Sequence, residues 1–279
     1  MNNEQSRFRK AERKKGKFKG ALVGSSGCGK TWTSIKVMRG LIGEDGQMAV
    51  ADTENGSAEL YSHLTPFDIT IIEPDYTVQK FLDVIDAATA EGYQGLIVDG
   101  ISPFWVGKGG LLNYKTNLEK RGKNSFTAWA EITPLYQEFV SAILHAKLHL
   151  ICTLRAKTDY SMTTDNGITK VIKQGLAPIM RDELDFEFTT VFMLDQQHKA
   201  TVSKDRTSIF EHRGIFDIGT QTGIEILNWL NSGADTTEEI DVSKVITTEK
   251  VMQFGQQHEK EYTTQSKSTK TPTKTELDF

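Results

Sequence analysis

The stretch ALVGSSGCGKTW, residues 21–32, decides how the rest of the sequence is interpreted. An apolar run enters a glycine-rich turn, and the turn matches the pattern G-x-x-x-x-G-K-[ST] at every fixed position. The glycines let backbone N–H groups converge on a phosphate group at the start of the helix that is predicted to follow. This turn, which we call the phosphate loop, predicts a nucleotide-binding site made of Gly24, Ser25, Ser26, Gly27, Cys28, Gly29, Lys30 and Thr31.

Two of these side chains and one later carboxylate are expected to handle the phosphates and a metal ion. Lys30 should reach the β- and γ-phosphates of ATP, and the Thr31 hydroxyl should ligate Mg²⁺. Asp99 ends the apolar run GLIVD and has the form of a Walker B aspartate, which would hold the magnesium shell through water. An aspartate that caps the next helix is the alternative interpretation. The predicted cofactors are therefore ATP and Mg²⁺.

The order of apolar segments predicts an α/β fold. Short apolar runs are typical of strands, and amphipathic stretches are typical of helices, one of them carrying Pro134 as a kink or a true start. Their alternation predicts a mostly parallel central sheet flanked by helices on both faces. The predicted strands are 19–23, 47–53, 69–74, 94–100 and 148–155, and the predicted helices are 30–41, 77–91 and 126–146.

The pattern changes after Arg155. A β-hairpin is predicted with its turn at 165–167, because Asp-Asn-Gly separates two alternating runs. Further strands at 185–195 and 199–206 predict an antiparallel extension of the sheet, and 222–230 predicts a closing helix. Between the strand of Asp99 and the next helix, residues 102–125 are polar and glycine-rich, and they are predicted to form a long loop.

Charge and composition divide the chain into three parts. The net charge is −4, yet residues 1–19 contain eight lysines and arginines against two glutamates. That segment predicts either a basic arm for a polyanion or a solvated leader. Polar residues dominate after Ser232, where we expect a flexible tail with one short helix near 247–261. The predicted parts are an arm over 1–17, a core over 18–231 and a tail over 232–279.

The sequence predicts a cytoplasmic protein. Its two cysteines lie far apart, which is not a disulfide framework. No apolar run approaches the ~20 residues that a membrane span needs. The N-terminus lacks the apolar segment of a secretory signal.

A glutamate near the second strand points to a family. Gly100 follows Asp99, where many ring ATPases have a glutamate. Instead, Glu54 stands at the tip of the preceding strand in the context VADTENGS, and this arrangement resembles the RecA-type recombinase core. The resemblance implies a RecA-like P-loop NTPase fold in which Glu54 activates the attacking water. The alternative is an exposed glutamate in a turn.

The same resemblance assigns a role to TVSKDRTS, residues 201–208. In RecA-type ATPases and related hexameric helicases, a Lys-x-Arg pair at a late strand end reaches the site of the neighbouring subunit. Lys204 and Arg206 would then stabilise charge on the γ-phosphoryl group in trans, as an arginine finger does. This implies a homo-oligomer, a ring or a filament. Alternating charges at an ordinary strand end are the alternative.

RecA-type cores also direct two loops toward single-stranded DNA. Here these positions are 102–125 and 156–180, where aromatic and cationic residues are interleaved, as single-strand binders require. A substrate lid and a surface loop without a ligand are the alternatives. The candidate DNA contacts are Trp105, Lys108, Lys115, Arg121, Lys123, Arg155, Lys157, Lys170 and Lys173.

The segment 173–207, with its GLAP, RD and EF elements, is similar to bacteriophage-encoded RecA-like ATPases, which include single-strand annealing proteins. The resemblance covers about residues 17–230 and implies DNA recombination in the cytoplasm of a bacterial host. Phe8–Ala11 fits the Phe-x-x-Ala plug of some recombinases. The final ELDF is similar to the tips of single-strand-binding proteins, which adds such a protein as an expected partner, although a frayed end is the simpler interpretation.

Two other functions stay open from the sequence. A P-loop small-molecule kinase would use 102–125 as a lid over its acceptor. A nucleotide-dependent adaptor or loader of a replication protein would hydrolyse ATP slowly.

Overall fold

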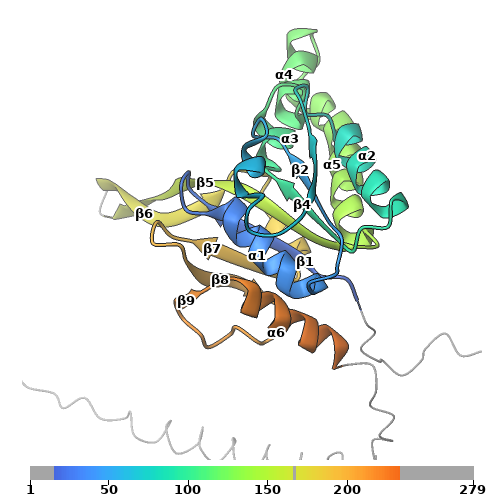
Figure 1. Cartoon of the computed structure of the whole chain (residues 1–279). Helices are drawn as coiled ribbons and strands as arrows, with labels where there is room; N and C mark the ends of the chain where they lie inside the picture. The colour runs from blue at the N-terminus through green and yellow to red at the C-terminus, as the bar shows by residue number, and fades with distance from the viewer. Residues whose placement is uncertain (1–15, 166–167, 233–279) are drawn as a thin grey trace, which may run out of the picture. The chain divides into compact units, whose positions relative to one another are not determined.

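The strand that precedes the phosphate loop lies in the middle of a large sheet. A computed structural model describes residues 16–165 and 168–232. For residues 158–174 it describes the backbone but not the side chains. In this part of the chain, β1 (Lys19–Gly24) pairs in parallel with β5 (His149–Asp165) on one side and β7 (Thr190–Leu194) on the other. Figure 1 shows β1 between these neighbours. Since a central strand is buried on both faces, its continuous apolar sequence is explained.

The whole sheet has nine strands in the described residues, and its order is β3-β2-β4-β5-β1-β7-β8-β9, with β6 paired to β5. Strands β3, β2, β4, β5, β1 and β7 are parallel, whereas β8, β9 and β6 are antiparallel to their neighbours. This confirms the predicted parallel sheet with an antiparallel extension. The remaining strands are β2 (Met48–Asp52), β3 (Asp68–Ile71), β4 (Gly95–Asp99), β6 (Ile168–Pro178), β8 (Lys199–Asp205) and β9 (Phe216–Asp217).

Helices cover both faces of the sheet. One face carries α1 (Lys30–Ile42) and α6 (Thr220–Asn231), and the other carries the remaining helices (Figure 1). Side chains of β1 alternate between the two cores, as the pleat requires. The helices of this second layer are α2 (Val78–Ala90), α3 (Ser102–Val106), α4 (Leu111–Lys120) and α5 (Ser125–His145). The described residues also form two short 3₁₀ helices, η1 (Ser57–Tyr61) and η2 (Leu184–Glu187).

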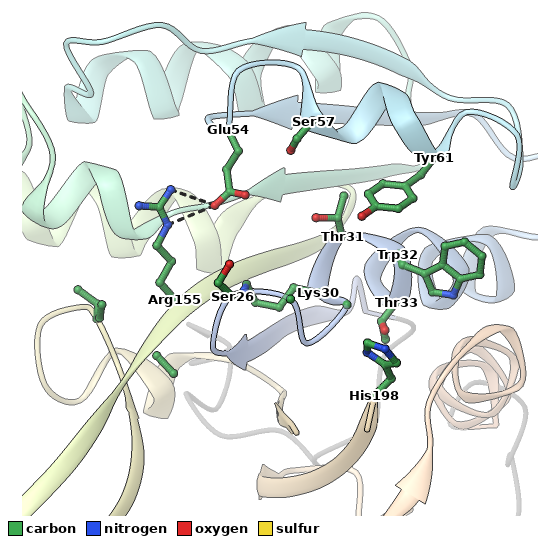
Figure 2. A pocket seen from close by; sticks show the side chains of 14 residues that line it. Ser26, Lys30, Thr31, Trp32, Thr33, Glu54, Ser57, Tyr61, Arg155 and His198 are labelled. Carbon is green, nitrogen blue, oxygen red and sulfur yellow. Dashed lines mark hydrogen bonds and ion pairs between the residues drawn. The ribbon is translucent and has the colours of Figure 1, made fainter. Parts of the chain in front are cut away.

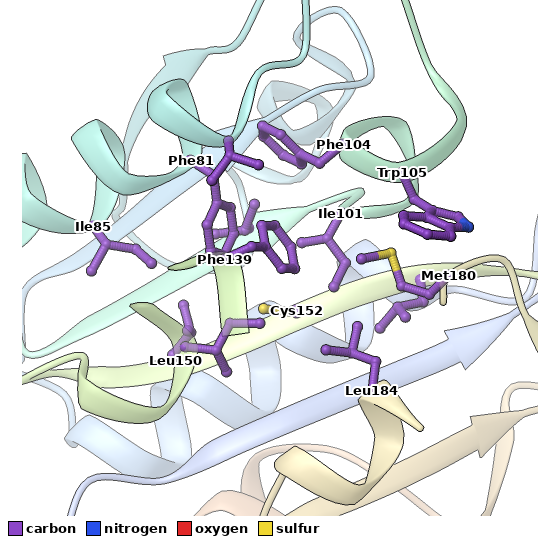
Figure 3. Close-up of a cluster of buried hydrophobic side chains, with 14 of the residues drawn as sticks. Phe81, Ile85, Ile101, Phe104, Trp105, Phe139, Leu150, Cys152, Met180 and Leu184 are labelled. Atoms are coloured by element: carbon purple, nitrogen blue, oxygen red, sulfur yellow. The ribbon is translucent and has the colours of Figure 1, made fainter. Parts of the chain in front are cut away.

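An aromatic cluster binds the second helix layer to the sheet. The rings of Phe81 and Phe139 lie 4.2 Å apart, and Phe104 lies 5.3 Å from Phe81; all three side chains are fully buried. Figure 3 shows them above Leu150 and Cys152 of β5. Truncating any one to alanine should cost about 3–5 kcal/mol of stability, since each leaves a cavity. Strand β5 is therefore packed against α2 and α5 through this cluster.

Two glycines let α1 and α6 touch through their backbones. A Cβ on Gly40 would lie 1.9 Å from the Thr220 carbonyl oxygen, and one on Gly223 would lie 2.0 Å from the Val37 carbonyl oxygen. Any side chain at either position would push the helices apart. This close contact fixes α1, and with it the helix N-terminus at the phosphate loop.

The sequence prediction for residues 102–125 is wrong. This segment forms α3 and α4 rather than a long loop, because Phe104, Leu111 and Leu118 are buried at spacings that suit short helices. The predicted strand 185–195 is also too long, since its first residues form η2. Pro134 lies inside α5, which begins at Ser125, so it does not mark the helix start.

The predicted hairpin after Arg155 is confirmed by the antiparallel pairing of β5 with β6, in which Asp165 is opposite Ile168. Cys28 and Cys152 are buried free thiols. Within 16–165 and 168–232, no helix has both the length and the apolar character needed to cross a bilayer. The predicted helix near 247–261, the plug at Phe8–Ala11 and the C-terminal ELDF lie outside the described residues, as does most of the predicted arm and tail.

Polar groups are buried at the end of the sheet away from the phosphate loop. Lys19 Nζ donates to the carbonyl oxygens of Ala146 and Leu148, at 2.6 and 2.7 Å, and caps the end of α5. Burial lowers the pKa of Lys19 to about 8. The backbone N–H of Phe18 donates to His149 Nδ1 at 3.1 Å. Burial, helped by the charges of Lys17 and Lys19, lowers the pKa of His149 to about 3.

His149 should make the fold sensitive to mild acid. Because its pKa is lowered on folding, the unfolded chain takes up a proton below about pH 6.5 while the folded chain stays neutral until about pH 3. Stability is therefore lost as the pH falls through this window, by about 2 kcal/mol at pH 5. Urea unfolding at pH 7.5 and pH 5 should show this loss in the wild type, and His149→Asn should remove most of it.

The exposed His145 provides the matched control. His145→Asn should leave the pH dependence of unfolding unchanged. An equal acid sensitivity in His149→Asn and the wild type would contradict the assignment.

Candidate nucleotide-binding site

The carboxyl ends of the parallel strands meet at one edge of the sheet and enclose a pocket of about 970 Å³. Its lining comes from the phosphate loop, the segment after β2, the middle of β5 and the turn between β7 and β8. Figure 2 shows Glu54 and Arg155 at one end of this pocket and Trp32 and Tyr61 at the other. A pocket of this size is large enough for a nucleotide.

The phosphate loop has the backbone that its glycines predict. Gly27 and Gly29 have φ of 78° and 82°, in the left-handed region, and Gly29 precedes the first turn of α1. Lys30 Nζ donates to the carbonyl oxygens of Gly24 and Ser25, at 3.2 and 2.9 Å. The ammonium group therefore lies over its own loop, where the phosphates of a nucleotide are expected.

Thr31 and Asp99 are brought together by the fold. Thr31 Oγ1 donates to Asp99 Oδ2 at 2.7 Å, and Thr153 Oγ1 donates to Asp99 Oδ1 at 2.6 Å. Asp99 is 1% exposed, and burial raises its pKa, an effect that the hydrogen bonds from Thr153 and Thr31 oppose. A threonine hydroxyl beside a carboxylate is a donor set of hard oxygens, and this fits Mg²⁺.

The segment that carries Glu54 is anchored to the strand that carries Asp99. The buried Asp52 carboxylate accepts hydrogen bonds from the backbone N–H groups of Glu54 and Ala58, the latter at 2.8 Å. Thr53 Oγ1 donates to the carbonyl oxygens of Asp99 and Gly100, at 3.0 and 2.8 Å. The backbone of Glu54 is thus fixed relative to Asp99.

This anchoring also explains the glycine after Asp99. Gly100 has φ of 92°, and a Cβ on it would lie 2.3 Å from Thr53 Oγ1. No acid can stand at position 100 without displacing Thr53. Glu54 is therefore the carboxylate that this arrangement presents to the pocket next to Asp99.

Glu54 is not free in the pocket. Arg155 Nε and Nη2 both donate to Glu54 Oε1, at 3.2 and 3.0 Å (Figure 2). Arg155 was predicted from the sequence to contact DNA, but the structure brings its guanidinium group to the predicted water-activating carboxylate. The cause is the register of β5, in which Arg155 pairs with Gly24 at the start of the phosphate loop.

The other end of the pocket is aromatic. The Trp32 ring lies 6.0 Å from those of Tyr61 and His63, and Lys36 Nζ lies 5.1 Å from the Trp32 ring. Trp32 is 38% exposed. Such faces are suited to stacking with a planar group such as a nucleobase.

The turn between β7 and β8 holds the phosphate loop from the side opposite β5. Gln196 Nε2 donates to Ser25 Oγ at 2.6 Å and to the Ser26 carbonyl oxygen at 3.2 Å. His198 lines the pocket, and a Cβ on Gly29 would lie 3.0 Å from its Nδ1. A residue other than glycine at position 29 would therefore push against this ring.

Lys204 and Arg206 lie away from this pocket. Thr190 of β7 is paired with Asp205 of β8 on one side and with Gly20 of β1 on the other. The end of β8 therefore lies near the start of β1. Arg206 Nη2 donates to the Phe186 carbonyl oxygen at 2.7 Å, and Lys204 Nζ contacts the same oxygen. The two cations hold η2 in their own chain, at the edge of the sheet opposite the phosphate loop.

Among the candidate DNA contacts, Trp105 is a wrong prediction. It is 7% exposed, and its ring lies 6.2 Å from Trp129 and 6.0 Å from Tyr136, so no face is available for a base. Lys115 is turned inward, with an ion pair to Glu119 at 2.7 Å. Trp105 lies on α3 and Lys115 on α4. The prediction of a polar loop over 102–125 did not include the packing of these helices.

The other candidate cations have different surroundings. Lys108 and Lys123 form ion pairs with Asp75 and Glu131, while Arg121 and Lys157 are exposed. The side chains of Lys170 and Lys173 lie outside the described residues. These cations thus remain untested predictions.

Sequence reasoning missed the roles of Asp52, Arg155, Gln196 and His198 at the pocket. Asp52 and Arg155 each end a predicted strand, and position at the carboxyl edge was the available signal. The positions of Gln196 and His198 at the pocket could not be predicted in this way, because they depend on the pairing of β7 with β1.

Known proteins resemble this chain at two levels. A family model described as "AAA domain" matches residues 16–220. Among solved structures, the chain is similar to a KaiC-like protein from the hyperthermophilic archaeon Pyrococcus horikoshii, with a TM-score of 0.37 and 15% identity, over 67% of this chain and 78% of that chain. Among curated proteins, no match was found.

Proposed function

The chain belongs to the AAA domain family, a nucleotide-binding P-loop ATPase domain, and we propose that it hydrolyses ATP in order to pair or anneal single-stranded DNA as an oligomer. The observation that carries the proposal is that Thr31 and Glu54 line one pocket, and that Thr31 is hydrogen-bonded to the buried carboxylate of Asp99. A phosphate cradle, a metal-binding pair and a carboxylate near the terminal phosphate are the parts that hydrolysis needs.

The two ends of the pocket give the nucleotide a direction. The terminal phosphate would point toward Glu54, the carboxylate proposed to act on it, and Thr31 with its partner Asp99 would lie beside the phosphates. The nucleobase then lies toward Trp32 and Tyr61.

The chemistry follows from these positions. Backbone N–H groups of the phosphate loop and Lys30 hold the phosphates, and Glu54 orients a water molecule and takes its proton as the water attacks the γ-phosphorus atom. ADP then leaves as the bond to the β–γ bridging oxygen breaks. Mg²⁺, held by Thr31 and by Asp99 through water, would neutralise charge on the phosphate oxygens.

Single-stranded DNA is the proposed partner. Phe126 is 82% exposed at the start of α5, and the exposed Arg121 and the partly exposed Lys123 lie in the preceding turn. An aromatic face beside cations is the combination that binds bases and phosphates of a single strand. The basic residues within 1–19 would add phosphate contacts.

Lys204 and Arg206 lie at the edge opposite their own phosphate loop, so a role for them in hydrolysis would require the pocket of a neighbouring copy. Residues 102–125, which the kinase alternative would use as its lid, form α3 and α4, with Phe104, Leu111 and Leu118 buried. A bacteriophage origin and a recombination role rest on the sequence resemblance.

Single-stranded DNA should raise ATP turnover. Glu54→Gln should lower turnover about 10²- to 10⁴-fold with ATP binding retained, because the proton acceptor is lost. Phe126→Ala should weaken DNA binding about tenfold, since stacking on one base is lost. Steady-state phosphate release and fluorescence anisotropy with a labelled oligonucleotide measure both effects.

Ile215, which is 68% exposed, provides the control, and Ile215→Ala should leave DNA binding unchanged. If DNA neither binds nor changes turnover, the DNA role is wrong. Transfer of phosphate to a small acceptor would then favour the kinase.

Subunits with complementary defects should restore each other. Lys30→Ala removes the phosphate contact and Arg206→Ala removes the proposed trans contact, so a mixed interface can contain one intact site. Mixing the two inactive variants should recover part of the wild-type turnover. If both variants fold and assemble but no mixture recovers activity, the site is not shared.

A further inference from the structure

Arg155 and Glu54 face each other from two fixed points of the backbone. The N–H group of Arg155 is held by Ser102 Oγ at 3.0 Å, and its carbonyl oxygen accepts from Ile179 N at 2.7 Å. The N–H group of Glu54 is held by the buried Asp52. Both backbone positions are therefore anchored by hydrogen bonds, and a change in their contact needs movement of the two side chains alone.

The contact between them is partial. Both nitrogen donors of Arg155 meet one oxygen, Oε1 of Glu54, and the arginine and glutamate side chains are 52% and 33% exposed. Exposed ion pairs stabilise little, because water competes for both charges. The pair is therefore strong enough to orient Glu54 and weak enough to be opened by a better anion.

A nucleoside triphosphate brings such an anion to this place. The proposed orientation puts the terminal phosphate beside Thr31, Asp99 and Glu54, within the pocket that Arg155 lines. A terminal phosphate carries more negative charge than a carboxylate and offers oxygens in the geometry of a guanidinium fork. A diphosphate has no phosphate group at this end.

We propose that Arg155 is a positioning residue that holds Glu54 until a nucleoside triphosphate displaces it. On triphosphate binding, the guanidinium group passes from Glu54 Oε1 to the terminal phosphate, and the carboxylate becomes available to water. With a diphosphate, the ion pair stays closed. The inference rests on the proposed function and adds a regulation to it, since Glu54 is released when a phosphate to be cleaved is present.

The consequence can be measured as an energetic coupling in nucleotide binding. Wild type, Glu54→Gln, Arg155→Gln and the double variant form a cycle, and each is titrated with a non-hydrolysable ATP analogue and with ADP. Glu54→Gln removes two obstacles to the triphosphate: the repulsion from the carboxylate and the ion pair. In the Arg155→Gln background there is no ion pair, so Glu54→Gln removes only the repulsion between the carboxylate and the triphosphate.

The expected result is a difference between the two nucleotides. Glu54→Gln should tighten binding of the ATP analogue about two- to fivefold more in the presence of Arg155 than in its absence, a factor typical of an exposed pair. For ADP this factor should be close to one. Arg155→Lys should give a smaller factor with the analogue, because one ammonium group replaces two donors.

Three other outcomes have separate meanings. A factor of one for both nucleotides, with all variants bound and folded, would overturn the proposal. An equal factor above one for both would also overturn it, since the pair would then be a structural contact opened by any nucleotide. Failure of the wild type to bind either nucleotide would overturn the proposed function itself, and the inference with it.

Glu59 supplies the matched control for loss of a negative charge. It lies on η1, five residues after Glu54, and its side chain is exposed. Glu59→Gln should give a factor of one with both nucleotides when it is compared between the wild-type and Arg155→Gln backgrounds. Thermal unfolding of every variant checks that the differences do not come from loss of the fold.

Discussion

The hydrogen bond from Thr31 to Asp99 is the contact on which the site depends. It joins the first turn of α1 to the end of β4, although β5 separates β4 from β1 in the sheet. Asp99 is almost fully buried, and a buried carboxylate without partners is costly, so the hydroxyls of Thr31 and Thr153 are required there. The register of three parallel strands brings these side chains together, and the close packing of α1 on α6 holds the helix end in place.

Other parts of the pocket are arranged around this contact. Thr53 ties the segment after β2 to the end of β4, which places Glu54 beside Asp99 and explains why position 100 is glycine. The continuation of β5 past the sheet places Arg155 at the pocket and at the base of the β5–β6 hairpin at once. Arg155 therefore links the nucleotide pocket directly to the β5–β6 hairpin.

The sequence predicted the parts of the fold that depend on local patterns. The phosphate loop, the parallel strands and the hairpin follow from glycine positions, apolar runs and an Asp-Asn-Gly turn, and the structure has all three. Contacts between distant segments were not predictable. Trp105 looked like an exposed aromatic in a polar loop, and its burial depends on Trp129 and Tyr136 of α5. Arg155 looked like a DNA contact for the same reason, since its partner Glu54 lies 101 residues earlier.

The central claim is that Thr31 and Asp99 form the metal-binding half of an ATP site. Isothermal titration with ATP, in the presence and absence of Mg²⁺, tests it most directly, with Asp99→Asn compared to the wild type and Thr31→Ser as the control that keeps the hydroxyl. The account predicts that Mg²⁺ tightens ATP binding at least about tenfold in the wild type and in Thr31→Ser, and that Asp99→Asn loses this dependence while the phosphate loop still binds ATP. An undiminished Mg²⁺ dependence in Asp99→Asn would contradict it.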